Sequence, residues 1–288
     1  MTESSSSSPP EMPATLREIV EHKRAEVASA KSRTPISELR ARAEDAEPAR
    51  DFFEALTEPK PGRDETRVIA EVKRRSPSAG LIRPEYDADG FDPADIAQKY
   101  SKGGASAISC LTDEKFFGGS LAFINPIKDQ ISLPVLRKDF IIDPYQVIEA
   151  RAHGADAILL IAECLNDEHI RELLDASNEL GLSALLEVHS RQNLLRVLPI
   201  LEEPLNPRTL LGINNRDLNR MVTNLSQTTD LLELVPDPAM LVSESGIRTH
   251  DDLAHLRSHG VHAALIGEHL MRQPDPGAAL KAMLRPAD

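Results

Sequence analysis

Lysine and glutamate side chains stand at the ends of several apolar runs in this sequence, where they could transfer protons. Glu71 and Lys73 close the run that begins at Val68, and Lys138 and Glu187 close two later runs. Side chains alternate across a strand, so Glu71 and Lys73 point the same way. Opposite charges on one face of a buried strand are costly unless they pair or do chemistry. On their own, these two residues fit a structural ion pair and an active site equally well.

The positions of Lys138 and Glu187 favour chemistry. Lys138 shares a face with Leu136, and Glu187 shares a face with Leu185, so each charge continues a column of apolar side chains. An ammonium and a carboxylate that meet in a partly desolvated opening have shifted pKa values and can exchange protons near neutral pH. The spacing therefore predicts an acid–base pair above an apolar core.

Positive charge is concentrated at two run ends, although the chain carries a net charge of -13. The clusters Lys73-Arg74-Arg75 and Arg137-Lys138 each follow an apolar run, which indicates a pocket for a small anion. For Arg74 and Arg75, solvated charges at the start of a loop explain the pattern as well. We interpret Asp139 as a loop or helix cap. The acidic balance argues against nucleic acid or an anionic membrane as a partner.

Two glycines indicate where a phosphate could bind. Gly246 and Gly267 each stand where a late apolar run gives way to a loop or helix. In barrels of eight βα units, the loops after strands seven and eight bind phosphate through backbone N–H groups. Glu268 is expected to contribute only its backbone N–H, because a carboxylate is an unusual neighbour for phosphate. Either glycine alone would also fit a simple turn.

Eight apolar runs of strand length alternate with helical segments, and this alternation predicts the fold. The runs are Val68–Val72, Ala105–Leu111, Pro134–Leu136, Ala157–Ile161, Ser183–Leu186, Leu210–Ile213, Met240–Val242 and Ala263–Ile266. Strands that alternate with helices form parallel sheets with right-handed crossovers, and eight such units over roughly 220 residues match a (β/α)8 TIM barrel. A doubly wound sheet is the alternative, but the first run is followed by Ser-Pro-Ser-Ala-Gly rather than a glycine-rich dinucleotide turn.

The chain before the first run is expected to have two parts. Residues 1–14 form a Ser-rich tail that we expect to be disordered, without the features of a signal peptide. Residues 15–67 carry three helical patterns and are expected to pack as an extension on the barrel of residues 68–288. No apolar run reaches membrane-spanning length. Cys110 and Cys164 are interpreted as buried thiols of a reducing cytoplasm.

No metal constellation is evident among the nine histidines or the two cysteines. His255 and His259 lie four residues apart on a predicted helix, but they lack the glutamate of a zinc motif. His189 lies two residues after Glu187 and could hydrogen-bond nearby, at most in support of the site.

Several stretches together resemble the indole-3-glycerol phosphate synthase family. They are Ile69–Ser78, Leu111–Ser120, Leu136–Ile141, Leu186–His189, Gly212–Leu218, Ser243–Ile247 and Leu265–Gly267. The likeness runs in order from about Leu16 to the C-terminus. It implies a TIM-barrel carboxy-lyase of tryptophan biosynthesis that needs no metal or organic cofactor, is cytoplasmic, and is a monomer or a weak dimer.

The resemblance also implies a role for each residue of the site. The substrate would be 1-(2-carboxyphenylamino)-1-deoxyribulose 5-phosphate, which undergoes ring closure, loss of CO₂ and loss of water. Lys138 would be the general acid and Glu187 the general base. Lys73, held by Glu71, would bind the anionic substrate and supply a proton during dehydration, and Asn214 would orient Glu187 and the sugar hydroxyls.

The remaining implied residues would contact the substrate. Pro77, Phe117, Phe140 and Leu218 would form the wall for the anthranilate ring, although core packing explains Leu218 equally well. The polar contacts would come from Ser76, Arg216, Glu244, Ser245, Gly246, Gly267 and Glu268, of which the last four form the phosphate cup. Ala79 and His269 depart from residues common in relatives, and neither position belongs to the implied acid or base.

Other functions share this pattern of residues. A sugar-phosphate isomerase or a Schiff-base aldolase could use the same barrel, because one fold hosts many chemistries. A barrel that only binds a phosphorylated aromatic compound would not need Lys138 or Glu187, and both are present.

Overall fold

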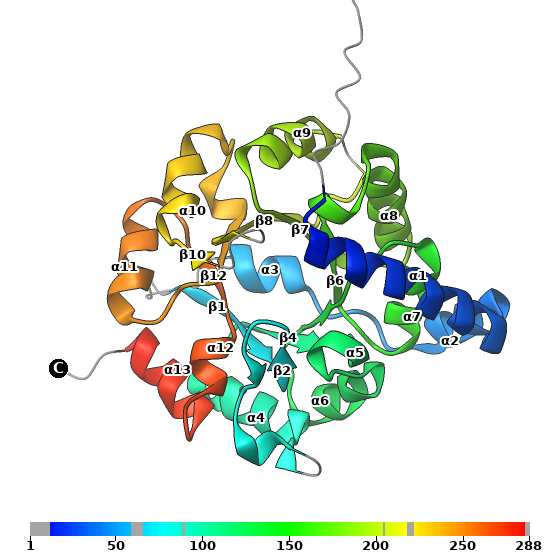
Figure 1. The fold of residues 1–288 in the computed structure, drawn as a ribbon, viewed down its shortest axis with the longest axis horizontal. Helices are drawn as coiled ribbons and strands as arrows, with labels where there is room; N and C mark the ends of the chain where they lie inside the picture. The colour runs from blue at the N-terminus through cyan, green and yellow to red at the C-terminus, as the bar shows by residue number, and fades with distance from the viewer. Residues whose placement is uncertain (1–11, 59–65, 88–89, 204, 218–221, 286–288) are drawn as a thin grey trace, which may run out of the picture.

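Eight parallel strands close into a barrel in the computed structural model, which describes residues 12–58, 66–87, 90–203, 205–217 and 222–285 (Figure 1). Around the barrel the strands follow the order β1, β12, β11, β8, β7, β6, β5, β4. Their bounds are β1 Arg67–Val72, β4 Ala107–Leu111, β5 Val135–Lys138, β6 Ala157–Ile161, β7 Ser183–Val188, β8 Thr209–Asn214, β11 Leu241–Glu244 and β12 Ala263–Ile266. The predicted (β/α)8 barrel is confirmed, and each predicted run overlaps one of these strands.

Helices surround the barrel, and all of them but the last connect consecutive barrel strands (Figure 1). They are α4 Pro93–Gly103, α6 Ile124–Gln130, α7 Pro144–Ala152, α8 Asp167–Glu179, α9 Arg191–Leu201, α10 Ser226–Leu231, α11 His250–Ser258 and α13 Pro276–Leu284. Shorter elements follow several strand ends: α5 Glu114–Phe117, α12 Glu268–Met271, η4 Ala162–Cys164, and the hairpins β2 Arg75–Ser76 with β3 Gly80–Leu81 and β9 Arg216–Asp217 with β10 Val222–Thr223.

Side-chain caps form the starts of several of these helices. The carboxylate of Asp92 accepts hydrogen bonds from the backbone N–H groups of Ala94 and Asp95 at the start of α4. Thr249 and Asp252 form a reciprocal capping box at the start of α11. These caps satisfy N–H groups that have no partner within the helix, and they fix where each helix begins after its strand.

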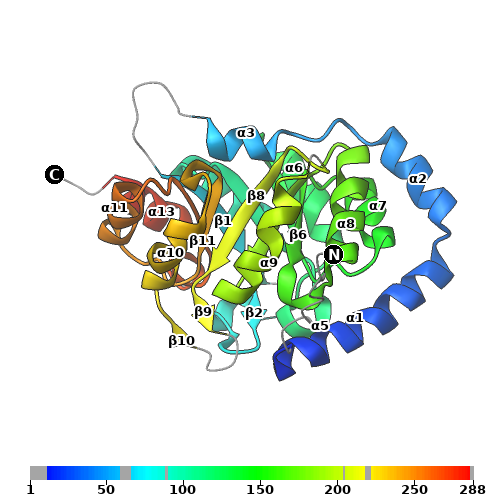
Figure 2. The same cartoon turned by 90° about the horizontal axis from the view of Figure 1, so that it is seen from above.

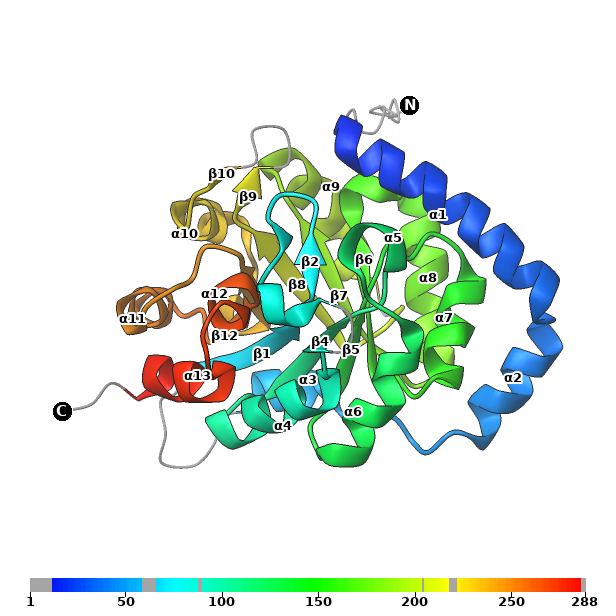
Figure 3. The ribbon, with the colours of Figure 1, turned by 60° about the horizontal axis from the view of Figure 1, so that its bottom comes forward.

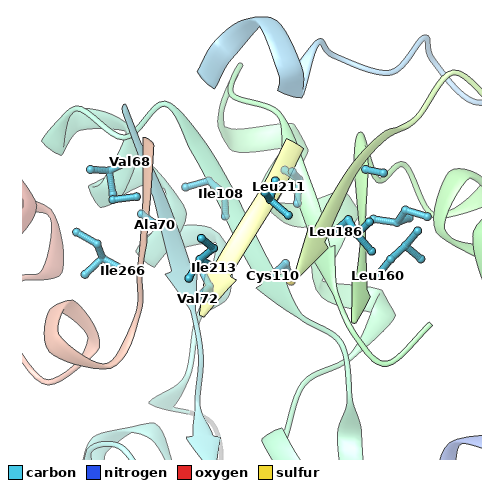
Figure 4. Packing of buried hydrophobic residues seen from close by; sticks show 14 of the residues in the cluster. Val68, Ala70, Val72, Ile108, Cys110, Leu160, Leu186, Leu211, Ile213 and Ile266 are labelled. Atoms are coloured by element: carbon cyan, nitrogen blue, oxygen red, sulfur yellow. The ribbon is translucent and has the colours of Figure 1, made fainter. Parts of the chain in front are cut away.

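Two apolar layers lie on opposite faces of the barrel wall. Alternate strand residues point outward and pack beneath the helices, among them Val68, Ile108, Leu160, Leu186 and Ile213 (Figure 4). The residues between them point inward and fill the barrel, including Ile69, Leu136, Leu159, Leu185, Leu210, Val242 and Leu265. This alternation turns Lys138 and Glu187 inward, in the column of Leu136 and Leu185, as the sequence predicts.

Three helices precede β1 and run along the barrel from one end to the other (Figures 2 and 3). They are α1 Ala14–Arg33, α2 Ile36–Asp45 and α3 Phe52–Thr57. Phe52 and Leu56 of α3 are fully buried against the inner layer, so α3 covers one end of the barrel. Helix α1 lies at the opposite end, beside α7 and η4 (Figure 2). Residues 1–11 of the expected tail lie outside the described residues, and the division into tail, extension and barrel stays a prediction.

A buried lysine connects α1 to the barrel. Lys23 is fully buried, and its Nζ lies 2.8 Å from Oδ1 of Asp139 and 3.0 Å from Oδ2 of Asp113. Burial alone would lower the pKa of Lys23, but Asp139 and Asp113 raise it above its usual value. Asp139 also lies 3.1 Å from Arg137, whose side chain points outward and contacts Glu149 at 2.9 Å.

Two expectations from the sequence are therefore wrong. Asp139 is not a simple cap: α7 is capped by Asp143, and Asp139 is the centre of this buried charge cluster. Arg137 does not face an anion pocket, because strand alternation turns it away from Lys138 and towards α7.

We expect Lys23→Met to lower the free energy of unfolding by about 3–5 kcal/mol, since it leaves Asp113 buried without its cation and Asp139 with Arg137 alone. Urea denaturation followed by circular dichroism measures the loss. The control is Lys31→Met on the same helix, whose pair with Asp143 is largely exposed and is expected to contribute about 0–1 kcal/mol. Equal losses in the two variants would contradict the role given to the buried cluster.

Candidate active site

A cavity of about 860 Å³ opens at the C-terminal ends of the barrel strands. Every barrel strand contributes to its lining, and Leu16 and Ile19 of α1 border it as well. This volume suits a small-molecule ligand. The residues predicted from the sequence that line it are Glu71, Lys73, Ser76, Pro77, Phe117, Lys138, Phe140, Glu187, Asn214, Arg216, Glu244, Ser245, Gly246, Gly267 and Glu268. Leu218 lies outside the described residues.

One ammonium group stands between two carboxyl groups at the centre of the cavity. Nζ of Lys138 lies 2.7 Å from Oε2 of Glu187 and 2.9 Å from Oε2 of Glu244. Both glutamates are buried, and Asn214 donates to Oε1 of Glu187 at 3.2 Å. The predicted pairing of an amine from one strand end with an acid from another is therefore present, with a second acid beside it.

These contacts and the burial of the three groups shift the pKa values of Lys138, Glu187 and Glu244 in different directions. Burial would lower the pKa of Lys138, but Glu187 and Glu244 raise it above its usual value, so the ammonium form persists. Burial would raise the pKa of Glu187, yet Lys138 and His189 lower it to about 2. Burial and the charge of Glu187 both raise the pKa of Glu244 well above its usual range. The pair therefore consists of an ionised Glu187 and a Glu244 that tends to hold a proton.

A glycine in β8 makes this arrangement possible. Gly212 lies between Glu187 of β7 and Val242 of β11, and a Cβ at this position would stand 2.4 Å from Oε1 of Glu244. The absence of a side chain lets the Glu244 carboxyl reach Lys138 across the barrel. The sequence analysis did not identify Gly212 as a site residue, because a glycine within an apolar run gives no sign of what it accommodates.

Glu71 and Lys73 form a second pair at the end of strand β1. Nζ of Lys73 lies 2.5 Å from Oε1 of Glu71, and both side chains are largely shielded from solvent. A Cβ at Gly267 would stand 2.2 Å from the same Oε1. Gly267 thus makes room for Glu71, a reason for the glycine that differs from the phosphate approach expected from the sequence.

Aromatic and apolar side chains form one wall of the cavity. The rings of Phe117 and Phe140 lie with centroids 6.1 Å apart and planes tilted by 38°. Pro77 lines the same cavity from the loop between β2 and β3. This surface can accept the face of a planar aromatic group.

The loop after β11 contains two successive residues with positive φ. Ser245 and Gly246 have φ values of 68° and 84°, and Ser245 is the one residue other than glycine with positive φ among the described residues. Successive residues of this kind can direct their N–H groups towards one point. Strain of this type is tolerated where the surrounding structure supports it, which is common at functional sites.

Two arginines surround the side chain of Glu268. Arg272 donates to its carboxylate at 2.8 Å, and NH2 of Arg216 lies 3.7 Å from it. Arg216 also donates to the hydroxyl of Ser78 at 2.8 Å, which joins the hairpin β9–β10 to the loop after β1. The carboxylate of Glu268 is thus already engaged with cations.

His189 contacts Glu187, and Glu163 in turn contacts His189. Nε2 of His189 lies 3.1 Å from Oε1 of Glu187, and Nδ1 lies 3.0 Å from Oε2 of Glu163. The sequence analysis placed His189 in a supporting position and did not name Glu163. Glu163 follows β6 by two residues, in the short helix η4, where strand alternation no longer indicates the direction of a side chain.

Among the residues that the structure describes, no group of three or more histidine, cysteine, aspartate or glutamate side chains could hold a metal ion. Within the same described ranges, no helix has both the length and the apolar character needed to cross a membrane.

A closed barrel with acid and base groups facing one cavity at its strand ends defines a (β/α)8-barrel enzyme. The chain belongs to the indole-3-glycerol phosphate synthase family, whose sequence model matches residues 16–283. The family and the enzyme class expected from the sequence, a carboxy-lyase, are confirmed.

Similar proteins carry the same family name. An indole-3-glycerol phosphate synthase from Rhodopirellula baltica is 46% identical over 93% of this chain and 98% of its own length. The synthase from Rhodospirillum rubrum is 45% identical over the same shares of the two chains. The solved structure of 3-hexulose-6-phosphate synthase from Salmonella typhimurium has a TM-score of 0.58 and 14% identity, and covers 76% of this chain and 98% of that one. At this identity, the last likeness concerns the fold alone.

We expect Gly212→Ala to lower kcat by about 10² or more, because the new Cβ displaces the Glu244 carboxyl from Lys138, and small misplacements in an active site have effects of that size. Steady-state kinetics measures the loss. The control is Gly181→Ala, which has a φ of 72° and no atom near the new Cβ, so it should lose stability but keep its turnover. A Gly212 variant that turns over like the control would contradict this account.

Proposed function

We propose that this protein catalyses the cofactor-free conversion of 1-(2-carboxyphenylamino)-1-deoxyribulose 5-phosphate into indole-3-glycerol phosphate, CO₂ and water, as a step of tryptophan biosynthesis. Family membership supports this substrate, and the activity for which the relatives are named supports the product. The observation that carries the proposal is the contact of 2.7 Å between Lys138 and Glu187 inside one cavity.

Ring closure needs an acid, and Lys138 suits this role. As the aromatic carbon attacks the ketone carbon, the carbonyl electron pair takes a proton from the Lys138 ammonium. Two carboxyl neighbours keep this group protonated before the reaction. Loss of CO₂ then returns its bonding electrons to the ring. Positioned general acids of this kind contribute about 10²–10⁴ in rate.

Removal of a proton during dehydration needs a base, and Glu187 suits that role. Its low pKa, set by Lys138 and His189 against the effect of burial, keeps it ionised at neutral pH. Asn214 donates a hydrogen bond to one carboxylate oxygen of Glu187 and lines the same cavity. Lys73, held by Glu71, is our candidate for binding the anionic substrate and for donating a proton to the departing hydroxyl.

The two ends of the substrate suit the two ends of the cavity. Phe117, Phe140 and Pro77 offer an apolar surface for the anthranilate ring. The positive-φ loop of Ser245 and Gly246, with the backbone of Gly267 and Glu268, is our candidate for the phosphate cup. Ser76 and Arg216 border the cavity between these ends and are proposed as further substrate contacts.

An aldolase that forms a Schiff base is disfavoured by the state of Lys138. Such an enzyme needs a neutral amine as the nucleophile. Here burial, which would favour the neutral amine, is outweighed by Glu187 and Glu244, which raise the pKa of Lys138.

We also propose that the protein acts as a cytoplasmic monomer, without a nucleic acid or membrane partner. The net charge of -13 and the two free cysteines support this environment. The exposed large apolar side chains among the described residues lie on four separate elements, which supports the monomer.

We expect Lys138→Met and Glu187→Gln each to lower kcat by at least about 10² while the fold is retained. The fluorescence of indole-3-glycerol phosphate measures turnover, and circular dichroism reports the fold. Lys99→Met is the control, because this lysine pairs with Asp95 on the outer helix α4.

Near-wild-type turnover in both site variants would show that the assigned roles are wrong. Trapping of a lysine adduct by borohydride would point instead to the aldolase.

A further inference from the structure

Lys138 is one cation shared by two buried carboxyl groups, so one of the two must be favoured as the ionised member. Two carboxylates beside one ammonium repel each other strongly when both are charged in a desolvated site. The structure gives the two groups unequal surroundings. Glu187 has contacts with Lys138, Asn214 and His189. Glu244 has its contact with Lys138, and its Oε1 has no hydrogen-bond partner among the described residues.

His189 accounts for much of this difference. Its ring lies between two carboxyl groups, 3.1 Å from Glu187 through Nε2 and 3.0 Å from Glu163 through Nδ1. A neutral imidazole has one N–H and would turn a lone pair towards one of the two carboxylates. A ring that has a carboxylate within ion-pair distance of each nitrogen is best matched when it carries both protons and therefore a positive charge.

Glu163 is built into the fold so that it faces this ring. Its Oε1 accepts hydrogen bonds from the backbone N–H of His189 and from Nδ2 of Asn193, both at 2.8 Å. Arg196 of α9 donates to the carbonyls of Ala162 and Leu165 on either side of Glu163, which fixes the short helix η4. Every contact that Glu163 makes here comes from a donor, which suits an ionised carboxylate.

The charged groups that face His189 come from three strand ends. Glu163 follows β6, Glu187 ends β7, and Lys138 ends β5. Burial and Lys138 lower the pKa of His189, whereas Glu187 and Glu163 raise it, and the net direction is upward. The electrostatics thus agree with the geometry of a doubly protonated ring.

We propose that His189, held by Glu163, is a positioning residue that keeps Glu187 as the ionised member of the Glu187–Glu244 pair. The proton of the pair then resides on Glu244, and Glu187 is free to accept a proton from the substrate. This inference rests on the proposed function, in which Glu187 is the base.

The first test compares kcat/KM of His189→Asn and wild type between pH 8 and pH 4, because their ratio cancels the titration of the substrate. Loss of a positive neighbour raises the pKa of a carboxyl by about 1–3 pH units. Glu187, with a pKa of about 2 in the wild type, would then begin to lose its charge near pH 4 to 5. We expect the ratio to fall as pH is lowered, by up to about tenfold.

A purely structural role for His189 predicts a ratio that is the same at every pH, and that result overturns the inference. His153→Asn is the matched control, because this partly buried histidine contacts a helix carbonyl and no site residue. Its ratio to wild type should stay constant. If Glu187→Gln is inactive while the kcat/KM ratio of His189→Asn to wild type does not change with pH, the inference is wrong and the proposed function stands. If Glu187→Gln is active, the proposed function fails too.

The second test uses the intact protein, in case His189→Asn does not fold. Nitrogen-15 NMR of the imidazole follows the loss of its second proton, and we expect His189 to titrate above the value of about 6.5 for a free histidine side chain. In Glu163→Gln the titration should move to lower pH, because one of the two stabilising carboxylates is lost. Titration of the wild-type ring at or below 6.5 overturns the inference.

Discussion

The site depends on one ammonium group placed between two buried carboxyl groups. Lys138 holds Glu187 and Glu244 within 3 Å of a single nitrogen, in a region that the barrel shields from water. Removal of the cation would leave two carboxyl groups competing for one proton, and removal of either carboxyl would leave the cation partly unpaired. Asn214, Gly212 and His189 are arranged around this contact, and each restricts where the two acids can lie.

The alternation of side chains along the barrel strands turns Lys138, Glu187 and Glu244 towards one another. Inward residues of alternate strands stand in layers, so a charged residue that follows an apolar inward column must face the cavity. This made Lys138 and Glu187 predictable from the sequence, because the period of a strand is local. The same rule turns Arg137 towards the helices, and the sequence analysis erred there by treating neighbouring cations as one group.

Three residues could not be predicted, and each for a different physical reason. Glu163 lies in a short helix after β6, where no strand period indicates the direction of a side chain. Gly212 is defined by the space that a distant carboxyl needs, which is a property of the assembled barrel. Lys23 lies on an amphipathic helix where lysines are normally exposed, and its partners come from strand ends far along the chain. Local patterns located the strands and their ends, whereas contacts between distant segments decided these positions.

The buried Lys23 also bears on the order in which the molecule assembles during synthesis. This lysine leaves the ribosome early, while Asp113 and Asp139 follow only after β4 and β5 have been translated. An ammonium transferred from water into apolar surroundings before its counter-ions arrive would be strongly unfavourable. We therefore expect the first helix of the nascent chain to stay in solvent until the first three barrel strands have been translated.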